Sequence, residues 1–217
     1  MIGLFGGTFD PVHCGHLRAA HEARVALGLD RVLMVPCGDP PHRGRPRADG
    51  EQRLAWLRTA VGDHPYLIAD DRELRRNGPS YTVDTLAELR HEVGPSEPVV
   101  LLLGVDAFLG LTGWHRWEQL LALAHLAILH RPDSVLPTAD PTGDPLQRLL
   151  ASHRCDSPRA LRDSPSGRLH TLAITPLAIS STAVRRLLQD GGDPCCLVPD
   201  RLRDALMASD AYRAACV

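Results

Sequence analysis

The chain has 217 residues, 44% hydrophobic and 23% charged, so it can bury a core and fits one large domain. All 24 of its cationic residues are arginine, which excludes a Walker A loop, a Schiff-base enzyme and a Ser–Lys hydrolase, because each needs a lysine. The net charge of −2 argues against a broad basic surface for nucleic acid but allows a small anion in an arginine-lined cleft.

No targeting or membrane signal stands out in the sequence. Residues 1–5 carry neither a basic segment nor a cleavable apolar one, and the longest apolar run, 99–105, is far shorter than the roughly 20 residues that a membrane helix needs. The six cysteines contain no C-x-x-C pair and are expected to be reduced thiols. We therefore expect a cytoplasmic protein without a membrane partner; a homo-oligomer is left open.

Apolar runs and helical periodicities alternate along the first half of the chain. They predict a strand over 2–5 ending at Gly6-Gly7, a helix from about 15 to 27, a strand over 31–36 and a helix over 51–61. Residues 37–50 form a loop that contains several prolines and arginines.

The second half continues the alternation. It predicts strands over 66–69, 99–103, 125–129 and 169–174, and helices over 83–93, up to 120–123, after 180 and around 202–206. Residues 132–168 look regular only at 146–151. The order of elements indicates an α/β fold, a Rossmann-like doubly wound parallel sheet with a small C-terminal helical portion. We expect a single domain over 1–217, in which about 175–217 form that helical part.

Ligands in such sheets lie beyond the carboxyl ends of the strands, and the first such end, 6–16, reads GGTFDPVHCGH. Pro11 delays the helix, so His13 and His16 come at its start, where free N–H groups and the helix dipole favour an anion. The alternatives are surface histidines or a zinc-binding pair. We find no fitting third zinc ligand and expect no metal held by the protein itself.

A second helix start, 179–185, reads ISSTAVR. Ser180, Ser181 and Thr182 exceed what one helix cap requires, and Arg185 follows one turn later. A plain capped helix with a surface arginine is the alternative. Together with the histidine turn, however, the pattern favours two helix starts that hold one polyphosphate.

The two motifs together resemble the nucleotidylyltransferase superfamily, whose HxGH and ISSTxxR signatures hold a nucleoside triphosphate. Five further segments are similar to the bacterial nicotinate-nucleotide adenylyltransferase family: PPHR at 40–43, PSYTVDTL at 79–86, GVDAF at 104–108, WHRW at 114–117 and HRP at 130–132. The resemblance spans residues 1 to about 208. It implies transfer of the adenylyl group of ATP, with Mg²⁺, to the 5′-phosphate of nicotinate mononucleotide, giving nicotinate adenine dinucleotide and pyrophosphate.

The resemblance also implies roles for single residues. His13, His16 and Arg185 would be catalytic, with His16 nearest the α-phosphate. The other residues implied to bind ATP are Gly7, Thr8, Phe9, Gly104, Asp106, Ser180, Ser181 and Thr182. Of these, Gly104 would allow adenosine to approach and Asp106 would bond a ribose hydroxyl; the alternative for Asp106 is a helix N-cap.

The mononucleotide would be bound by a second group of residues. Trp114 would stack on the pyridine ring, and amides near Tyr81 and Thr82, at a helix start, would receive its carboxylate. Trp56 and Trp117 have the spacing of helix core residues instead. His42, Arg43 and Arg131 are candidates for a phosphate. The family often has lysine at the position of Arg43, and arginine differs in reach and geometry.

Three other functions fit the sequence less well. Another small adenylyl- or cytidylyltransferase fits PSYTVDTL, WHRW and the chain length less well. A tRNA ligase would need an anticodon-binding region and the lysine of its second signature. A nucleotide sensor without turnover is disfavoured by the presence of His13, His16 and Arg185.

Overall fold

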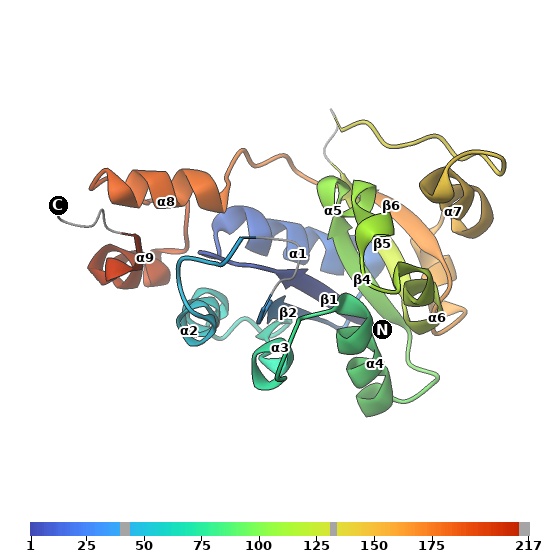
Figure 1. Cartoon of the computed structure of the whole chain (residues 1–217), viewed down its shortest axis with the longest axis horizontal. Helices are drawn as coiled ribbons and strands as arrows, with labels where there is room; N and C mark the ends of the chain where they lie inside the picture. Colours follow the sequence, from blue (N-terminus) through green and yellow to red (C-terminus); the bar gives the residue numbers. More distant parts are fainter. Residues whose placement is uncertain (40–43, 131–133, 213–217) are drawn as a thin grey trace.

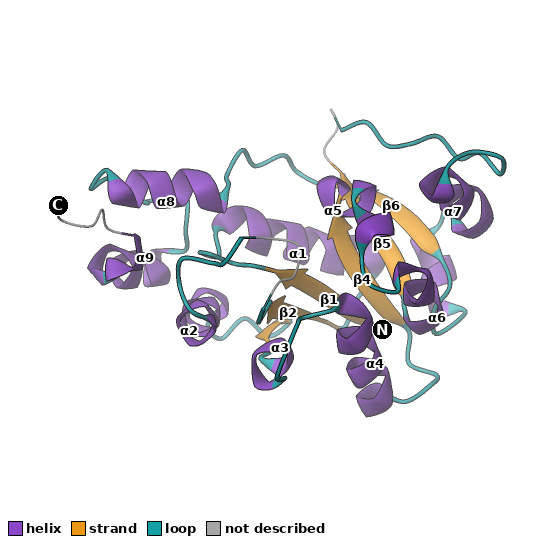
Figure 2. Ribbon diagram, in the orientation of Figure 1, coloured by secondary structure: helices purple, strands orange, loops and turns teal. Residues whose placement is uncertain are grey.

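The computed structural model describes residues 1–39, 44–130 and 134–212. Its central element is a six-stranded sheet in the order β3-β2-β1-β4-β5-β6 (Figures 1 and 2). Every neighbouring pair is parallel. The strands are β1 (Ile2–Gly7), β2 (Arg31–Pro36), β3 (Leu67–Ala69), β4 (Val99–Gly104), β5 (His125–His130) and β6 (Leu169–Ala173). The predicted parallel α/β sheet is confirmed, and the chain reverses its direction across the sheet between β1 and β4.

Helices connect the strands. They are α1 (Cys14–Leu27), α2 (Gly50–Val61), α3 (Arg72–Arg75), α4 (Thr82–Val93), α5 (Val105–Leu109), α6 (Leu120–Leu123), α7 (Pro145–His153), α8 (Ser181–Gln189) and α9 (Asp200–Ala208). Four short 3-10 turns, η1 (Leu111–Gly113), η2 (Trp117–Gln119), η3 (Pro158–Arg162) and η4 (Asp210–Tyr212), complete the regular structure.

The sheet is covered on both faces because its strands are apolar on both faces. In β4, Val100 and Leu102 join a buried cluster with α1, α2, α8 and α9. Leu101 and Leu103 point the other way, into a cluster with α4, α6 and α7. This alternation within one strand is the period-two pattern of a strand between two helix layers.

Local signals set several helix ends. Gly28 follows α1 with a φ of 67°, the left-handed conformation that glycine adopts without strain. Asp49 and Asp144 cap α2 and α7 by accepting backbone N–H bonds. The first helix begins at Cys14, slightly before the predicted start, because His13 is extended and itself takes the N-cap position. The four-residue α3 was not predicted, since it is too short to show a period.

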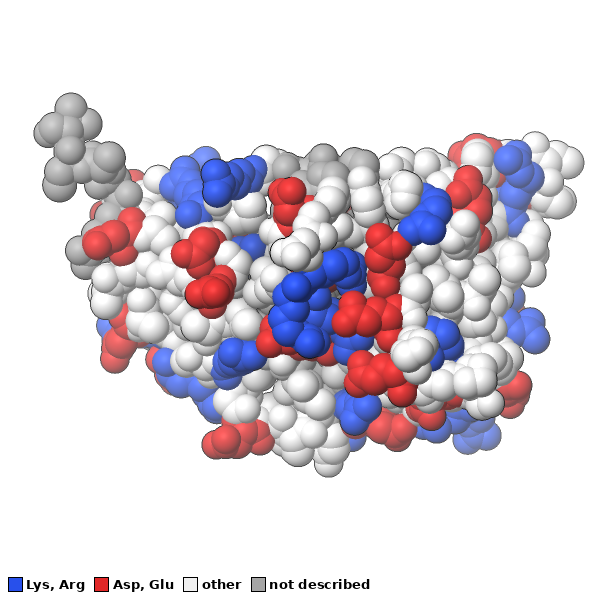
Figure 3. Space-filling model, turned by 60° about the horizontal axis from the view of Figure 1, so that its bottom comes forward, with Lys and Arg blue, Asp and Glu red and all other residues white. Residues whose placement is uncertain are grey.

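The C-terminal helices pack on the same layer as α1. Val184 and Leu188 of α8 and Leu202 and Leu206 of α9 are buried in the cluster that also contains α1 and α2. In the described residues, no helix combines the length and apolarity needed to cross a bilayer. Figure 3 shows basic and acidic side chains intermixed on one face of the molecule.

Candidate nucleotide-binding site

The two helix starts that carry the sequence motifs lie together, although 170 residues separate them. The Ser181 hydroxyl donates to the carbonyl oxygen of Pro11 at 2.9 Å. The Arg185 guanidinium donates to the carbonyl oxygen of Asp10 at 2.6 Å. The start of α8 is thus hydrogen-bonded directly to the turn that leads into α1, and the N-termini of the two helices lie close together.

The two motif histidines form a stacked pair at the start of α1. Their ring centroids are 3.7 Å apart with an interplanar angle of 26°. The backbone N–H of His13 donates to Nδ1 of His16 at 3.3 Å. The ring of Phe9 meets His16 edge-on at 5.0 Å. These contacts fix the imidazole of His16 in one orientation.

The same contacts define the protonation of His16. Because Nδ1 accepts a hydrogen bond, the neutral imidazole carries its proton on Nε2. Burial, and then the neighbouring His13, lower the pKa of His16 well below its usual value. At neutral pH His16 is therefore an uncharged imidazole that carries its proton on Nε2.

Two glycines make room for this arrangement. A Cβ on Gly15 would lie 3.0 Å from Nδ1 of His13, and one on Gly7 would lie 2.9 Å from the ring of Phe9. Phe9 is buried and has a φ of 47°. Gly7 and Gly15 thus permit aromatic rings to pack against the backbone.

The carboxylate of Asp10 holds the turn before α1 in place. This carboxylate is buried and accepts from the backbone N–H groups of Arg47 and Ala48, at 2.9 and 3.2 Å, and from the Tyr212 hydroxyl at 2.7 Å. The guanidinium of Arg185 lies 3.8 Å away. Asp10 therefore joins the first turn, the loop before α2 and the C-terminal segment.

A buried arginine completes the support. Arg53 is 1% exposed and donates to the carbonyl oxygens of Thr8 and Cys37, both at 2.7 Å, so it ties the ends of β1 and β2 together. This role could not be inferred from the sequence, in which Arg53 is one arginine within an amphipathic helix.

The hydroxyl residues of the second motif, predicted to bind ATP, have hydrogen-bond partners within the chain. Ser180 caps α8 by accepting from the N–H of Ala183 at 3.1 Å, and Ser181 donates its hydroxyl proton to Pro11. Thr182 is exposed and accepts from Arg185 at 3.1 Å. The hydroxyls of Ser180 and Ser181 therefore build the helix start, and its backbone N–H groups are the donors left for an anion.

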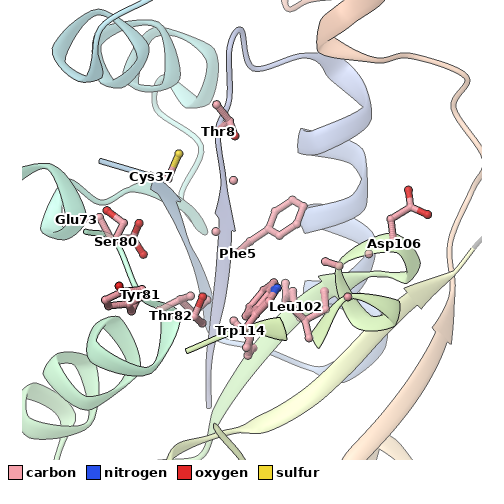
Figure 4. A pocket seen from close by; sticks show the side chains of 18 of the residues that line it. Phe5, Thr8, Cys37, Glu73, Ser80, Tyr81, Thr82, Leu102, Asp106 and Trp114 are labelled. Atoms are coloured by element: carbon pink, nitrogen blue, oxygen red, sulfur yellow. The ribbon is translucent and has the colours of Figure 1, made fainter. Parts of the chain in front are cut away.

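A cavity of about 260 Å³ opens at the carboxyl ends of β1 and β4, the neighbouring strands between which the strand order of the sheet reverses. Predicted residues from three segments line it: Gly7, Thr8, Tyr81, Thr82, Gly104, Asp106 and Trp114 (Figure 4). Asp106 is exposed at the second position of α5, and Gly104, not Asp106, occupies the cap. Trp114 is half-buried just after η1. Trp56 is buried as predicted, whereas Trp117 is half-buried and lies in η2.

The sequence did not indicate one wall of the cavity, which is formed by Glu73, Ser80 and His115. The Ser80 hydroxyl accepts from the N–H groups of Gly38 and Asp39, at 3.0 and 3.2 Å. Glu73 is buried, accepts from Thr85 at 2.7 Å and has its pKa raised by burial. The Tyr81 ring packs on His115 at 4.2 Å. Only the position of Ser80 beside Tyr81 offered a signal.

His42, Arg43 and Arg131 lie outside the described residues. Within them, no group of three or more His, Cys, Asp or Glu side chains could hold a metal ion. Asp10, the carboxylate beside the two helix starts, is already occupied by its three donors. The donor set at the site therefore suits phosphate oxygens rather than a bare cation.

Two helix N-termini with free N–H groups lie beside the point where the strand order of a parallel sheet reverses. This arrangement indicates a nucleotide-binding α/β protein. Residues 4–187 match the sequence model of the family described as cytidylyltransferase-like. The chain is 45% identical over 216 residues to a "Probable nicotinate-nucleotide adenylyltransferase" of Dechloromonas aromatica, covering 98% of this chain and 97% of the relative. A relative of the same name from Pseudomonas fluorescens is 46% identical over 213 residues, with 98% and 97% covered. The chain belongs to the nicotinate-nucleotide adenylyltransferase family.

Solved structures agree in fold. A Plasmodium falciparum nicotinic acid mononucleotide adenylyltransferase complexed with APC matches with a TM-score of 0.66 at 16% identity, covering 95% of this chain and 94% of that one. A putative nicotinate-nucleotide adenylyltransferase from Vibrio parahaemolyticus matches with a TM-score of 0.61 at 16% identity, with 95% and 97% covered.

Proposed function

We propose that this enzyme joins ATP and nicotinate mononucleotide. An oxygen of the mononucleotide 5′-phosphate bonds to the α-phosphorus of ATP, the bond from that phosphorus to the bridging oxygen of the β-phosphate breaks, and pyrophosphate leaves. The attacking phosphate is already ionised at neutral pH, so no general base is needed. The task of the protein is alignment and charge stabilisation.

ATP binds with its phosphates at the two helix starts. Nε2–H of His16 donates to the α-phosphate, where charge develops in the transition state, and His13 holds the His16 ring in place. The N–H groups at the start of α8 and the guanidinium of Arg185 receive the β- and γ-phosphates. Gly7, Thr8 and Phe9 shape the turn beneath them, and Asp106 bonds the ribose beyond Gly104.

Nicotinate mononucleotide occupies the cavity between β1 and β4. Trp114 stacks on its pyridine ring, and the N–H groups at the start of α4, near Tyr81 and Thr82, receive the carboxylate. His42, Arg43 and Arg131, outside the described residues, stay candidates for its phosphate. Burial raises the pKa of Glu73 on the wall of this cavity, which reduces its tendency to carry a negative charge beside this acid.

Mg²⁺ enters as part of the ATP substrate. It neutralises charge on the phosphates and keeps mostly water ligands, as this small cation does at many nucleotide sites. That agrees with a site rich in histidine, hydroxyl and arginine groups and with the full occupation of Asp10.

The observation that carries the proposal is the direct bonding of the α8 start to the turn before α1. The test is to incubate the protein with Mg-ATP and either nicotinate or nicotinamide mononucleotide and to measure pyrophosphate release. We expect a clearly higher kcat/KM for the acid. Absence of release with both mononucleotides would defeat the proposal, and a preference for the amide would defeat the assignment of the α4 start.

A further inference from the structure

Two adjacent cysteines lie exposed in the loop between α8 and α9. The sulfur atoms of Cys195 and Cys196 are only 3.6 Å apart. Cys196 has a φ of 63°, a left-handed conformation that a residue with a side chain rarely adopts. The backbone thus holds both thiols together.

The loop around the pair is well fixed. The carbonyl oxygen of Pro194 accepts from the N–H groups of Leu197 and Val198, at 3.0 and 3.3 Å. Asp193 accepts from the N–H of Cys195 at 3.0 Å and from two nitrogens of Arg203 at 2.6 Å each. A left-handed conformation is unfavourable for a residue with a side chain, so these contacts maintain an arrangement that the chain alone would not favour.

The separation of the sulfurs indicates the kind of ligand. Two thiolates on one tetrahedral zinc, with Zn–S bonds of about 2.3 Å, lie about 3.8 Å apart, so a gap of 3.6 Å fits two sulfurs on a single soft centre. Zinc needs four ligands, however, and the described residues contain no group of three donors able to hold a metal. Two thiols without further protein ligands suit an atom that forms two bonds to sulfur and already carries a third substituent.

We propose that Cys195 and Cys196 form a dithiol site that captures trivalent organoarsenic compounds, R–As=O. Two S–H bonds and the As=O bond break, two As–S bonds form, and the oxygen leaves with both protons as water. Arsenic stays trivalent, so the step needs no oxidant or reductant.

The loop that carries the cysteine pair is hydrogen-bonded to the start of α1, next to His13. The carbonyl oxygen of Leu197, next to the pair, accepts from the backbone N–H of Cys14 at 2.9 Å. Cys14 stands between His13 and Gly15 at the first position of α1. Burial, and then the neighbouring Asp200 and Cys196, raise the pKa of the Cys14 thiol. Because the sulfurs already have the separation that the ring needs, we expect the organic substituent on the arsenic, rather than ring closure itself, to displace Leu197 and disturb the start of α1; this consequence rests on the proposed function, whereas capture does not.

Capture is tested by intact-mass measurement of the reduced full chain with phenylarsine oxide. We expect one phenylarsenic group per chain, removed by 2,3-dimercaptopropanol but not by an equal concentration of a monothiol. Cys195→Ser and Cys196→Ser should each weaken capture at least tenfold. The matched variants Cys14→Ser, Cys155→Ser and Cys216→Ser should retain it. Unchanged capture in Cys195→Ser, or loss in any of the three control variants, would overturn the site.

The link to α1 is tested separately by activity. Saturating phenylarsine oxide should lower kcat/KM several-fold in the unsubstituted enzyme, and a dithiol should restore it. Cys195→Ser, active without the arsenical, should resist. Full capture with unchanged kcat/KM would overturn the link, and an inactive untreated enzyme would instead count against the proposed function.

Discussion

The position of His16 is set by the rings of Phe5, Phe9 and His13 and by one backbone hydrogen bond, so its role can be tested by a single substitution. We expect His16→Ala to lower kcat about a hundredfold or more, because one donor to the charge that develops on the α-phosphate is lost. The measurement is steady-state kinetics with saturating Mg-ATP and nicotinate mononucleotide.

His21→Ala is the matched control, since His21 lies on the same helix five residues further on. It should leave kcat within about twofold, as expected for a residue outside the transition-state contacts. A His16→Ala enzyme with nearly normal kcat and an unchanged circular dichroism spectrum would remove His16 from catalysis.

The lowered pKa of His16 also makes stability depend on pH. Below its ordinary pKa of about 6.5 the unfolded chain binds a proton at this residue that the folded protein does not. The free energy of unfolding should therefore fall as the pH drops below about 6.5, by at most about 1.4 kcal/mol per pH unit from this group. His125 contributes in the same direction, because burial also lowers its pKa.

Denaturant unfolding at pH 7.5 and 5.5 isolates the part due to His16. In His16→Asn the loss of stability between these two pH values should be smaller than in the unsubstituted protein. An equal loss in both would contradict the lowered pKa.

Trp114 lines the cavity beside the α4 start, where we place the pyridine ring. Trp114→Ala should raise KM for nicotinate mononucleotide about fivefold or more while changing KM for ATP far less, because base–aromatic stacking contributes about 1–3 kcal/mol. Trp117→Ala, three residues away in η2, is the control and should affect both values little. Equal increases in both KM values for Trp114→Ala would defeat the stacking assignment.

At the level of residues, the sequence identified those that carry a recognisable motif and missed those that support it. His13, His16, Trp114 and Arg185 belong to short patterns that place chemistry at a helix start or strand end. Arg53 could not be found, because its partners are carbonyl oxygens, which every residue has. The uses of Ser180 and Ser181 were also hidden, since a hydroxyl can cap a helix or contact a ligand equally well.

Helices and strands were predictable where apolar residues repeat over several turns or form an unbroken run, as in α1, α4 and β4. Predictions failed for α3 and η3, which are too short for a period to appear. The segment 132–168 gave only one regular stretch, and it corresponds to α7 with its Asp144 cap. The hydrogen bond from Tyr212 in η4 to Asp10 in the first turn joins residues 202 positions apart, and no local sequence pattern can indicate such a pairing.

That hydrogen bond predicts a stability effect. Tyr212→Phe removes the hydroxyl that donates to the buried carboxylate of Asp10, and hydrogen bonds to charged groups contribute about 1.5–3 kcal/mol. We expect the free energy of unfolding to fall by about that amount, with a higher KM for ATP because the turn before α1 loosens. Urea unfolding and steady-state kinetics measure the two effects.

Tyr66→Phe is the matched control, since Tyr66 is 39% exposed. It should change stability by less than about 0.5 kcal/mol, as most surface substitutions do. Equal stability of the Tyr212→Phe and unsubstituted proteins would show that Asp10 does not depend on this donor.

For the whole molecule, the proposed ATP site has the consequence that one ligand would contact both ends of the fold at once. A ligand that binds only the folded state at 100 times its Kd adds about 2.7 kcal/mol of stability. For a chain of this size, that corresponds to a rise in Tm of about 5–10 °C. A non-hydrolysable ATP analogue with Mg²⁺ should therefore raise Tm in a thermal scan without the mononucleotide.

Arg185→Ala should abolish most of this rise, whereas Arg186→Ala, its exposed neighbour on α8, should preserve it. A full rise in Arg185→Ala would show that the second helix start does not hold the phosphates.

The three tryptophans are divided between the two layers that sandwich the sheet. Trp56 packs on Tyr212 with ring centroids 5.3 Å apart in one layer, whereas Trp114 and Trp117 pack against the other. The chain therefore carries a separate fluorophore for each layer. Emission from a protein that retains only Trp56, set beside emission from one that lacks only Trp56, would reveal whether both halves melt in a single cooperative event or one after the other.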